Sequence, residues 1–240
     1  MRYELYYWPS IQGRGEFVRL ALEEVGVPYL DVARGGKSDG GMPAMFALLD
    51  GRKVARPSFA PPFLRAGRLL IGQTANILLF LGDRHGLAPC DEGGRLWVNQ
   101  LQLTIADWVV EAHDTHHPIS SGLYYENQRA EAKRRTEAFR KERLPKFLGY
   151  FERILERNGV AKRYLAGRSL SYADLSLFQV IAGLRYAFPG TMKRLEKRHP
   201  RVIALHDSVA ARRRIAAYLG SERRIPFNED GIFRHYPELE

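Results

Sequence analysis

Two short motifs with the chemistry of a peptide-binding site stand close together in this sequence. The proline pair at 61–62 precedes two strand-like runs, 63–66 and 68–71, and Gln73–Thr74 then precedes an apolar helical run. Because proline has no N–H, it leaves the neighbouring backbone free to pair with an extended chain. Gln73, and Thr74 as the predicted N-cap, offer hydrogen-bond donors and a positive helix end to a carboxylate. The motifs predict a site that grips a small acidic peptide.

A tyrosine at the end of the first predicted strand could act on a thiol. Residues 3–7 have a strand pattern, 8–13 form a turn, and an amphipathic helix starts near Arg14. By strand alternation, Tyr7 shares a face with Tyr3 and Leu5. A phenol that donates to sulfur stabilises a thiolate, and lowering a thiol pKa by about two units takes roughly 2.7 kcal/mol. Tyr7 is therefore the first candidate for chemistry.

These N-terminal features together resemble the glutathione transferase family. In its tyrosine-type classes the first strand ends in the catalytic tyrosine, and a Gly-Arg-x-Glu-like segment opens the next helix. Tyr7 and residues 13–16 occupy those places here, in a turn one residue longer than the sigma pattern. The resemblance is most specific over residues 1–85, and the sigma-like class fits best.

The resemblance implies that the protein takes glutathione as co-substrate and assigns a role to each candidate residue. Tyr7 would activate the thiol, with Ser10 in the same turn as the alternative, because some classes use a serine there. Gln73 and Thr74 would bind the γ-glutamyl carboxylate, and Arg14 would face the sulfur or the glycyl end. The full predicted glutathione site is Tyr7, Arg14, Pro61, Pro62, Gln73, Thr74 and Asp107.

Three of these assignments carry a specific expectation. Pro62 is the expected cis proline, and Pro61 offers the peptide only its carbonyl, whereas the family also uses the N–H of that residue. Asp107, in the apolar run 103–108, matches an acidic residue that reaches the γ-glutamyl ammonium bound to the other subunit. Lys37, Arg52 and Lys53 are the basic residues available for the glycyl carboxylate, and the residues do not single out one of them.

Composition restricts the class of protein. The net charge is +10, but most Lys and Arg lie on helical faces without the interleaved stacking aromatics of a nucleic-acid module, so we expect no nucleic-acid partner. The positive field should instead speed encounter with an anionic ligand. No apolar run is long enough to span a membrane, and one cysteine, Cys90, excludes an internal disulfide. A cytoplasmic protein is the simplest interpretation.

The order of predicted elements gives the fold class. We expect a thioredoxin-like α+β domain over residues 1–86, a linker, and an all-α helical bundle over 94–240 that carries the electrophile pocket. The first domain should run strand, helix, strand, strand, strand, helix, with a short helix possible at 42–49. Long helices are expected at 96–119 and 127–158, the second with a kink before Pro145, and further ones at 175–186 and within 201–219.

Two other sequence patterns indicate a structural role for their residues rather than a catalytic or metal-binding one. Ser171 and Asp174 form a capping box before an apolar helix, with Leu170 and Leu175 placed as a hydrophobic staple. The run of histidines at 113, 116 and 117 could in principle hold a metal, but the pattern supplies no further ligand, and we expect no metal site.

The sequence thus predicts a homodimeric glutathione transferase that attaches glutathione to a hydrophobic electrophile. A glutathione-dependent isomerase or peroxidase on the same fold stays open as an alternative, as does a non-catalytic ligand-binding protein. The electrophile itself cannot be named from the sequence, because its pocket is built from variable side chains on the long helices.

Overall fold

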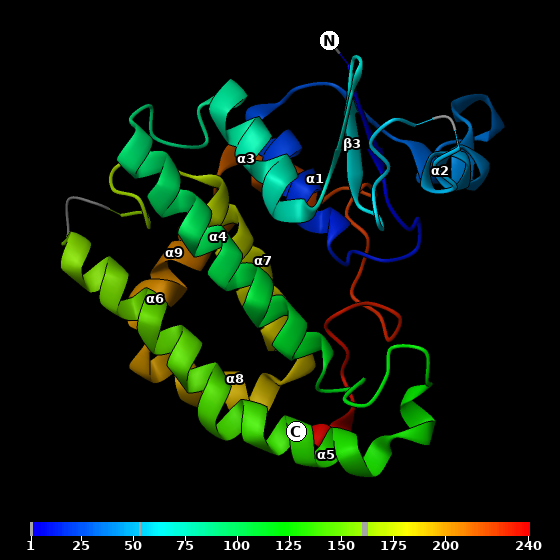
Figure 1. The fold of residues 1–240 in the computed structure, drawn as a ribbon. Coiled ribbons are helices and arrows are strands. Elements are labelled where there is room, and N and C mark those ends of the chain that lie inside the picture. The colour runs from blue at the N-terminus through cyan, green and yellow to red at the C-terminus, as the bar shows by residue number, and fades with distance from the viewer. Residues whose placement is uncertain (1, 53, 160–162) are drawn as a thin grey trace.

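The computed structural model describes residues 2–52, 54–159 and 163–240 and confirms the predicted fold class (Figure 1). Its N-terminal part is a four-stranded mixed sheet in the order β2-β1-β3-β4, with β1 parallel to β2 and antiparallel to β3. The elements of this part are β1 (Tyr3–Tyr6), α1 (Gly15–Val25), β2 (Tyr29–Asp31), α2 (Gly41–Leu49), β3 (Phe63–Ala66), β4 (Leu69–Gly72) and α3 (Thr74–His85).

Alternation along β1 separates two layers of side chains. Tyr3 and Leu5 point into the large core shared with α1 and α3. Tyr6 points to the other face and stacks on Phe63, with ring centroids 4.9 Å apart. Because Tyr6 pairs with Phe63 across β1 and β3, the residue after β1 lies beside the proline that precedes β3.

Helices make up most of the rest of the described chain (Figure 1). The long α4 crosses α7, and α7 also packs on α1 and α9, so α7 is the central helix of the molecule. Among the described residues, no helix has both the length and the apolar character needed to cross a membrane. The helices are α4 (Glu92–His113), α5 (Arg129–Ala138), α6 (Leu144–Asn158), α7 (Tyr172–Ala187), α8 (Pro189–Leu195), α9 (Pro200–Ala210) and α10 (Arg213–Leu219).

The long helix predicted at 96–119 is α4. It starts four residues before the predicted start and ends six residues before the predicted end. It begins at Glu92 because the Asp91 side chain caps it, accepting from the Gly94 N–H at 2.7 Å. It ends at His113, where the chain turns through a hydrogen bond from the His116 N–H to the His113 carbonyl. Pro118 also disfavours helical backbone at the residue before it.

The predicted helix 127–158 is interrupted before Pro145. Residues Phe139–Arg143 form a π-helical segment between α5 and α6. Pro145 cannot donate to the carbonyl four residues earlier and its ring crowds that carbonyl, so the hydrogen-bond pattern widens there. The helix predicted within 201–219 is likewise two helices, α9 and α10, and α8 was not predicted.

The capping box at the start of α7 is present, and its carboxylate has a third donor. The Asp174 carboxylate accepts from the Ser171 N–H at 2.7 Å, from the Ser171 hydroxyl at 2.6 Å and from the Leu165 N–H at 2.8 Å. Complete burial raises the pKa of Asp174 to about 6. The side chain thus fixes both the helix start and the preceding loop.

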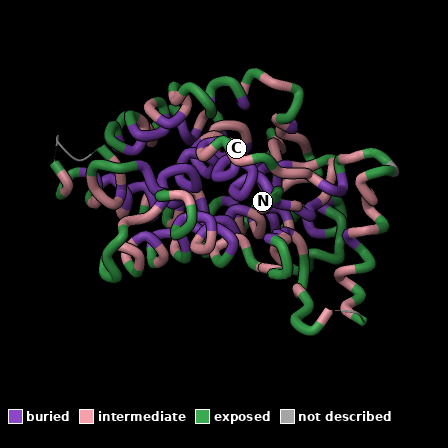
Figure 2. Tube along the Cα trace, turned by 90° about the horizontal axis from the view of Figure 1, so that it is seen from above, coloured by how far each residue is buried: buried purple, intermediate pink, exposed green. Residues whose placement is uncertain are grey.

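One continuous core joins the sheet region to the helices, as the purple segments in the middle of Figure 2 show. Trp108 of α4 lies at its centre, stacked on Phe147 and Phe151 of α6. The C-terminal tail after α10 passes from the sheet region down to α5 (Figure 1). There Tyr236 stacks on Tyr125, with ring centroids 3.9 Å apart.

Candidate functional site

Tyr7 lies immediately after β1, and its hydroxyl is held from one side only. The backbone N–H of Arg14 donates to the Tyr7 hydroxyl oxygen at 2.8 Å. Tyr7 is 4% exposed, and burial raises the pKa of its phenol against the opposing effects of the Arg14 N–H and the Arg14 and Arg19 charges. A phenol with a raised pKa stays protonated at neutral pH, so its O–H remains available to donate.

Two glycines of the turn allow the backbone to approach this ring. A Cβ at Gly13 would lie 2.0 Å from the Tyr7 hydroxyl oxygen, and Gly13 has a φ of +45°. A Cβ at Gly15 would lie 2.5 Å from the Tyr7 ring. Residues 13–15 are therefore shaped around Tyr7, because only glycine lets α1 begin against the phenol.

A buried arginine lies behind the same ring. The Arg19 guanidinium is 5.8 Å from the centroid of the Tyr7 ring and is fully buried. It donates to Asp31 at 2.7 Å and forms a 3.3 Å ion pair with Glu16. It also reaches the carbonyls of Ile11 and Gln12, both at 3.4 Å, and so fixes the turn that carries the site.

The proline pair immediately precedes β3, an inner strand of the sheet. The Pro61–Pro62 peptide bond is cis, as predicted for Pro62. The pairing of Tyr6 with Phe63 brings the backbone of Pro62 alongside that of Tyr7.

The N-terminus of α3 leaves polar groups without partners. Gln73, not Thr74, is the N-cap residue, and its backbone has a φ of 68° and a ψ of 122°. That conformation is costly for a residue other than glycine, and such residues cluster at ligand sites. Thr74 is the first helical residue instead of the predicted cap, and its buried Oγ1 has no hydrogen-bond partner among the described residues.

Three of the predicted site residues line one cavity of 540 Å³. Arg14, Gln73 and Thr74 line it from the turn and from α3, and residues of α4 form the opposite wall. The α4 wall is mainly apolar and includes the fully buried Ile105. The free N–H groups of the α3 first turn, Thr74 Oγ1 and the Arg14 guanidinium make this cavity suited to a carboxylate ligand.

Other predicted residues lie outside this cavity. Asp107 is exposed on α4 and does not line it within one chain. Ser10 is exposed in the turn, where its carbonyl accepts from the Asn228 side chain at 2.9 Å. Arg52 is 85% exposed and paired with Asp50 at 3.0 Å, and Lys53 lies outside the described residues.

The C-terminal tail holds the turn from the other side. The Gln12 side chain donates to the Ile225 carbonyl at 2.5 Å and accepts from Gln179 of α7 at 2.7 Å. Arg224 donates to Gln179 at 2.9 Å and also pairs with the buried Glu16. The turn between β1 and α1 is thus fixed by residues more than 160 positions away in sequence.

The histidine run forms a stack of neutral rings beside this tail. The Ile232 carbonyl only accepts, so His116 Nε2, 2.8 Å away, carries the proton. His116 Nδ1 therefore accepts from His117 Nδ1 at 2.5 Å. Burial lowers the pKa of His116 to about 2 and that of His117 to about 4. Within the described part of the chain, no group of three or more His, Cys, Asp or Glu side chains could hold a metal ion.

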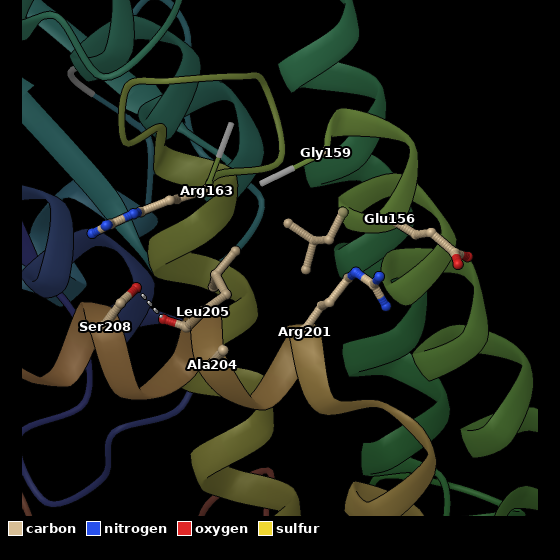
Figure 3. A pocket seen from close by; sticks show the side chains of 8 residues that line it. Glu156, Gly159, Arg163, Arg201, Ala204, Leu205 and Ser208 are labelled. Atoms are coloured by element: carbon tan, nitrogen blue, oxygen red, sulfur yellow. Dashed lines mark hydrogen bonds between the residues drawn. The ribbon is translucent and has the colours of Figure 1, made fainter. Parts of the chain in front are cut away.

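A second cavity, of 430 Å³, lies between α6 and α9 (Figure 3). Leu155 and Leu205 form its apolar wall, and Arg201, which pairs with Glu152 at 3.3 Å, stands at its edge. None of the predicted site residues lines this cavity.

Two functional candidates were missed by the sequence analysis. Gln102 of α4 is 1% exposed and lines the 540 Å³ cavity, and Arg19 lies behind Tyr7. Each is a polar residue between apolar neighbours on a helix, as in the run 101–103. A polar residue in such a place is seldom buried without a partner, and that signal could have drawn attention to both.

Comparison with known proteins identifies similar sequences and folds. The family description "Glutathione S-transferase, C-terminal domain" matches residues 113–222. Glutathione S-transferase P 1 of Xenopus laevis is 27% identical over 222 residues, which cover 92% of this chain and 93% of the relative. A glutathione S-transferase of Plasmodium falciparum is 25% identical over 197 residues, covering 79% and 83%.

Solved structures share the fold. A Pi-class glutathione S-transferase of Onchocerca volvulus superimposes with a TM-score of 0.72 at 22% identity, covering 96% of this chain and 99% of that one. Prostaglandin synthase D of Nilaparvata lugens gives a TM-score of 0.71 at 21% identity, covering 94% and 100%. The matched C-terminal region and the curated relatives support a glutathione S-transferase, and the solved structures share its fold.

Proposed function

We propose that the protein is a tyrosine-type glutathione transferase that conjugates glutathione to a hydrophobic electrophile. The observation that carries the proposal is the cavity where Arg14, Gln73 and Thr74 meet, next to a phenol whose O–H is free to donate. The sigma-like class remains a prediction, since the named relatives include a P-type enzyme.

The residues of this site suit the parts of glutathione. The γ-glutamyl carboxylate would lie at the N-terminus of α3, where Thr74 Oγ1 has no partner among the described residues and the N-cap side chain makes no hydrogen bond to the first turn. The cysteinyl unit would pair with the Pro61 carbonyl, in the segment that precedes β3, and would run from there toward Tyr7. That orientation brings the sulfur to the phenol.

Tyr7 would act by stabilising the thiolate rather than by removing the proton. Its hydroxyl oxygen already accepts the Arg14 N–H, so its own proton can be donated to sulfur. The nearby Arg14 and Arg19 charges favour the anion further. The thiol proton would leave to solvent, and the thiolate would attack the electrophile, with no covalent enzyme intermediate.

The test is binding followed by turnover. The wild-type protein should be retained on immobilised glutathione and released by free glutathione, and it should conjugate a generic aryl halide. Gln73→Ala should weaken glutathione binding by about 1–3 kcal/mol, because a charged carboxylate loses a partner. Gln100→Ala, on the exposed surface of α4, is the matched control. Failure to bind glutathione would refute the proposal.

Glutathione-dependent isomerisation is the second candidate. It needs a base near the sulfur, and His113 sits at the end of α4, where burial, together with the Arg14 and Arg234 charges, lowers its pKa. Its Nδ1 faces Asp114 at 3.2 Å, which leaves Nε2 as a free acceptor. If His113→Gln abolished turnover of an isomerisable substrate but spared conjugation, isomerisation would be the better description.

A homodimer and a cytoplasmic location complete the proposal. Leu96, Leu103 and Val110 form a stripe with a seven-residue repeat on α4, and they are 64%, 50% and 46% exposed. Phe59, 97% exposed before β3, adds a second apolar surface. Apolar side chains exposed in this way suit a subunit interface.

A further inference from the structure

The side-chain oxygen of Gln102 is buried and has no hydrogen-bond partner among the described residues, and Gln102 lines the 540 Å³ cavity. Gln102 is 1% exposed, so its amide is shielded from bulk water. A buried polar atom left unpaired destabilises the folded state, and such atoms in folded proteins call for a specific explanation.

The opposite wall carries a second unpaired oxygen. Thr74 Oγ1, on the first turn of α3, is also buried without a partner among the described residues and lines the same cavity. Figure 1 shows α3 and α4 side by side, so the two oxygens come from facing helices. A ligand with two polar groups, one for the Thr74 hydroxyl and one for the Gln102 oxygen, would satisfy both oxygens together.

The charges around the cavity decide which group meets Gln102. Arg14 is the one charged residue among its described lining residues, and no aspartate or glutamate lines it. The helix N-terminus, Thr74 and Arg14 all favour a negative group. A ligand ammonium in this cavity can therefore be met, within one chain, only by neutral oxygens such as that of Gln102.

We infer that Gln102 Oε1 accepts a hydrogen bond from the α-ammonium of the γ-glutamyl unit. This inference rests on the proposed glutathione site. The ammonium and the carboxylate share one carbon, so a carboxylate at Thr74 brings the ammonium into the same cavity. Gln102 thereby gives each subunit its own acceptor, separate from Asp107, which is exposed on another face of α4.

The experiment compares two peptides on two variants by calorimetry. Gln102→Met keeps the length of the side chain and removes the amide, and Gln100→Met is the same change on the exposed side of α4. The peptides are glutathione and glutaryl-cysteinyl-glycine, which lacks only the ammonium. We expect Gln102→Met to weaken glutathione about 10- to 100-fold and to leave the deaminated peptide within about two-fold of wild type.

Melting temperature supplies a second readout. Replacing an unpaired buried amide with an apolar side chain should leave the ligand-free protein as stable as wild type or more stable. Equal loss of both peptides would overturn the inference, because the amide would then contact something other than the ammonium. Unchanged glutathione affinity, or a large loss of stability, would overturn it too. If wild type bound neither peptide, the proposed function would fall with it, whereas failure of Gln102→Met alone leaves that function standing.

Discussion

The backbone N–H of Arg14 donates to the hydroxyl oxygen of Tyr7 at 2.8 Å, which couples the start of α1 to the end of β1. This bond occupies an acceptor site of the phenol and leaves its proton free. It also explains the spacing of the turn, because the backbone at residues 13–15 must reach the ring. The catalytic role proposed for Tyr7 therefore depends on backbone geometry as much as on the side chain.

Tyr7→Phe should leave the fold and the glutathione affinity nearly intact while raising the pKa of bound glutathione thiol. The phenol is the group that donates to sulfur, and a shift of about two pH units corresponds to roughly 2.7 kcal/mol. Thiolate absorbance of the complex against pH gives the value. Ser10→Ala is the control, and Tyr7 would lose its role if Ser10→Ala moved the titration and Tyr7→Phe did not.

Gly15→Ala should damage the site through packing alone. The added Cβ would lie 2.5 Å from the Tyr7 ring, so the phenol or the helix start must move. Overpacking of this kind costs about 1–3 kcal/mol of stability. Gly93→Ala, in the first turn of α4 with 3.5 Å of room, should be nearly neutral in thermal unfolding. Equal melting and equal activity for the two variants would show that the turn is not shaped around Tyr7.

The parts of the candidate site that could be predicted from sequence are those formed by residues close together along the chain. Tyr7, the proline pair and Gln73–Thr74 each sit at the end of a local element, so their placement follows from strand and helix signals. Gln102 could not be assigned, because its direction depends on how α4 packs on α3. The same holds for the tail, where Asn228 returns to Ser10 across the whole chain.

Asp174→Ala should lower the free energy of unfolding by about 2–6 kcal/mol. Two buried backbone N–H groups, of Leu165 and Ser171, lose their shared acceptor, and each such group costs about 1–3 kcal/mol. Denaturant unfolding measures the change, and glutathione affinity of the folded fraction should be retained. Wild-type stability with lost activity would instead indicate a catalytic carboxylate.

Acid should destabilise the protein through the histidine stack. The pKa of His116 falls to about 2 in the folded state, against about 6.5 when unfolded, because of burial and the Arg234, His113 and His117 charges. The unfolded chain therefore binds more protons below pH 6.5, and stability is lost as the pH falls from there.

His116→Gln isolates this contribution. The variant should reduce the slope of unfolding free energy against pH between about 4 and 6 by up to about 1.4 kcal/mol per pH unit. Asp174, with its pKa raised to about 6, acts in the opposite direction in this window and is unchanged in the variant. Parallel pH profiles for wild type and variant would contradict a neutral, buried His116.

The apolar stripe on α4 should be a dimer interface that also serves the ligand. Asp107 lies on this stripe, four residues after Leu103 and three before Val110, so a partner chain packed here would face its carboxylate. Leu103→Glu should dissociate the dimer in light scattering, because it buries a charge in an apolar contact. Asp107→Asn should keep the dimer and weaken glutathione in calorimetry, since the charge that faces the partner's ligand ammonium is removed. A fully active wild-type monomer at micromolar concentration would refute both the interface and the role of Asp107 across it.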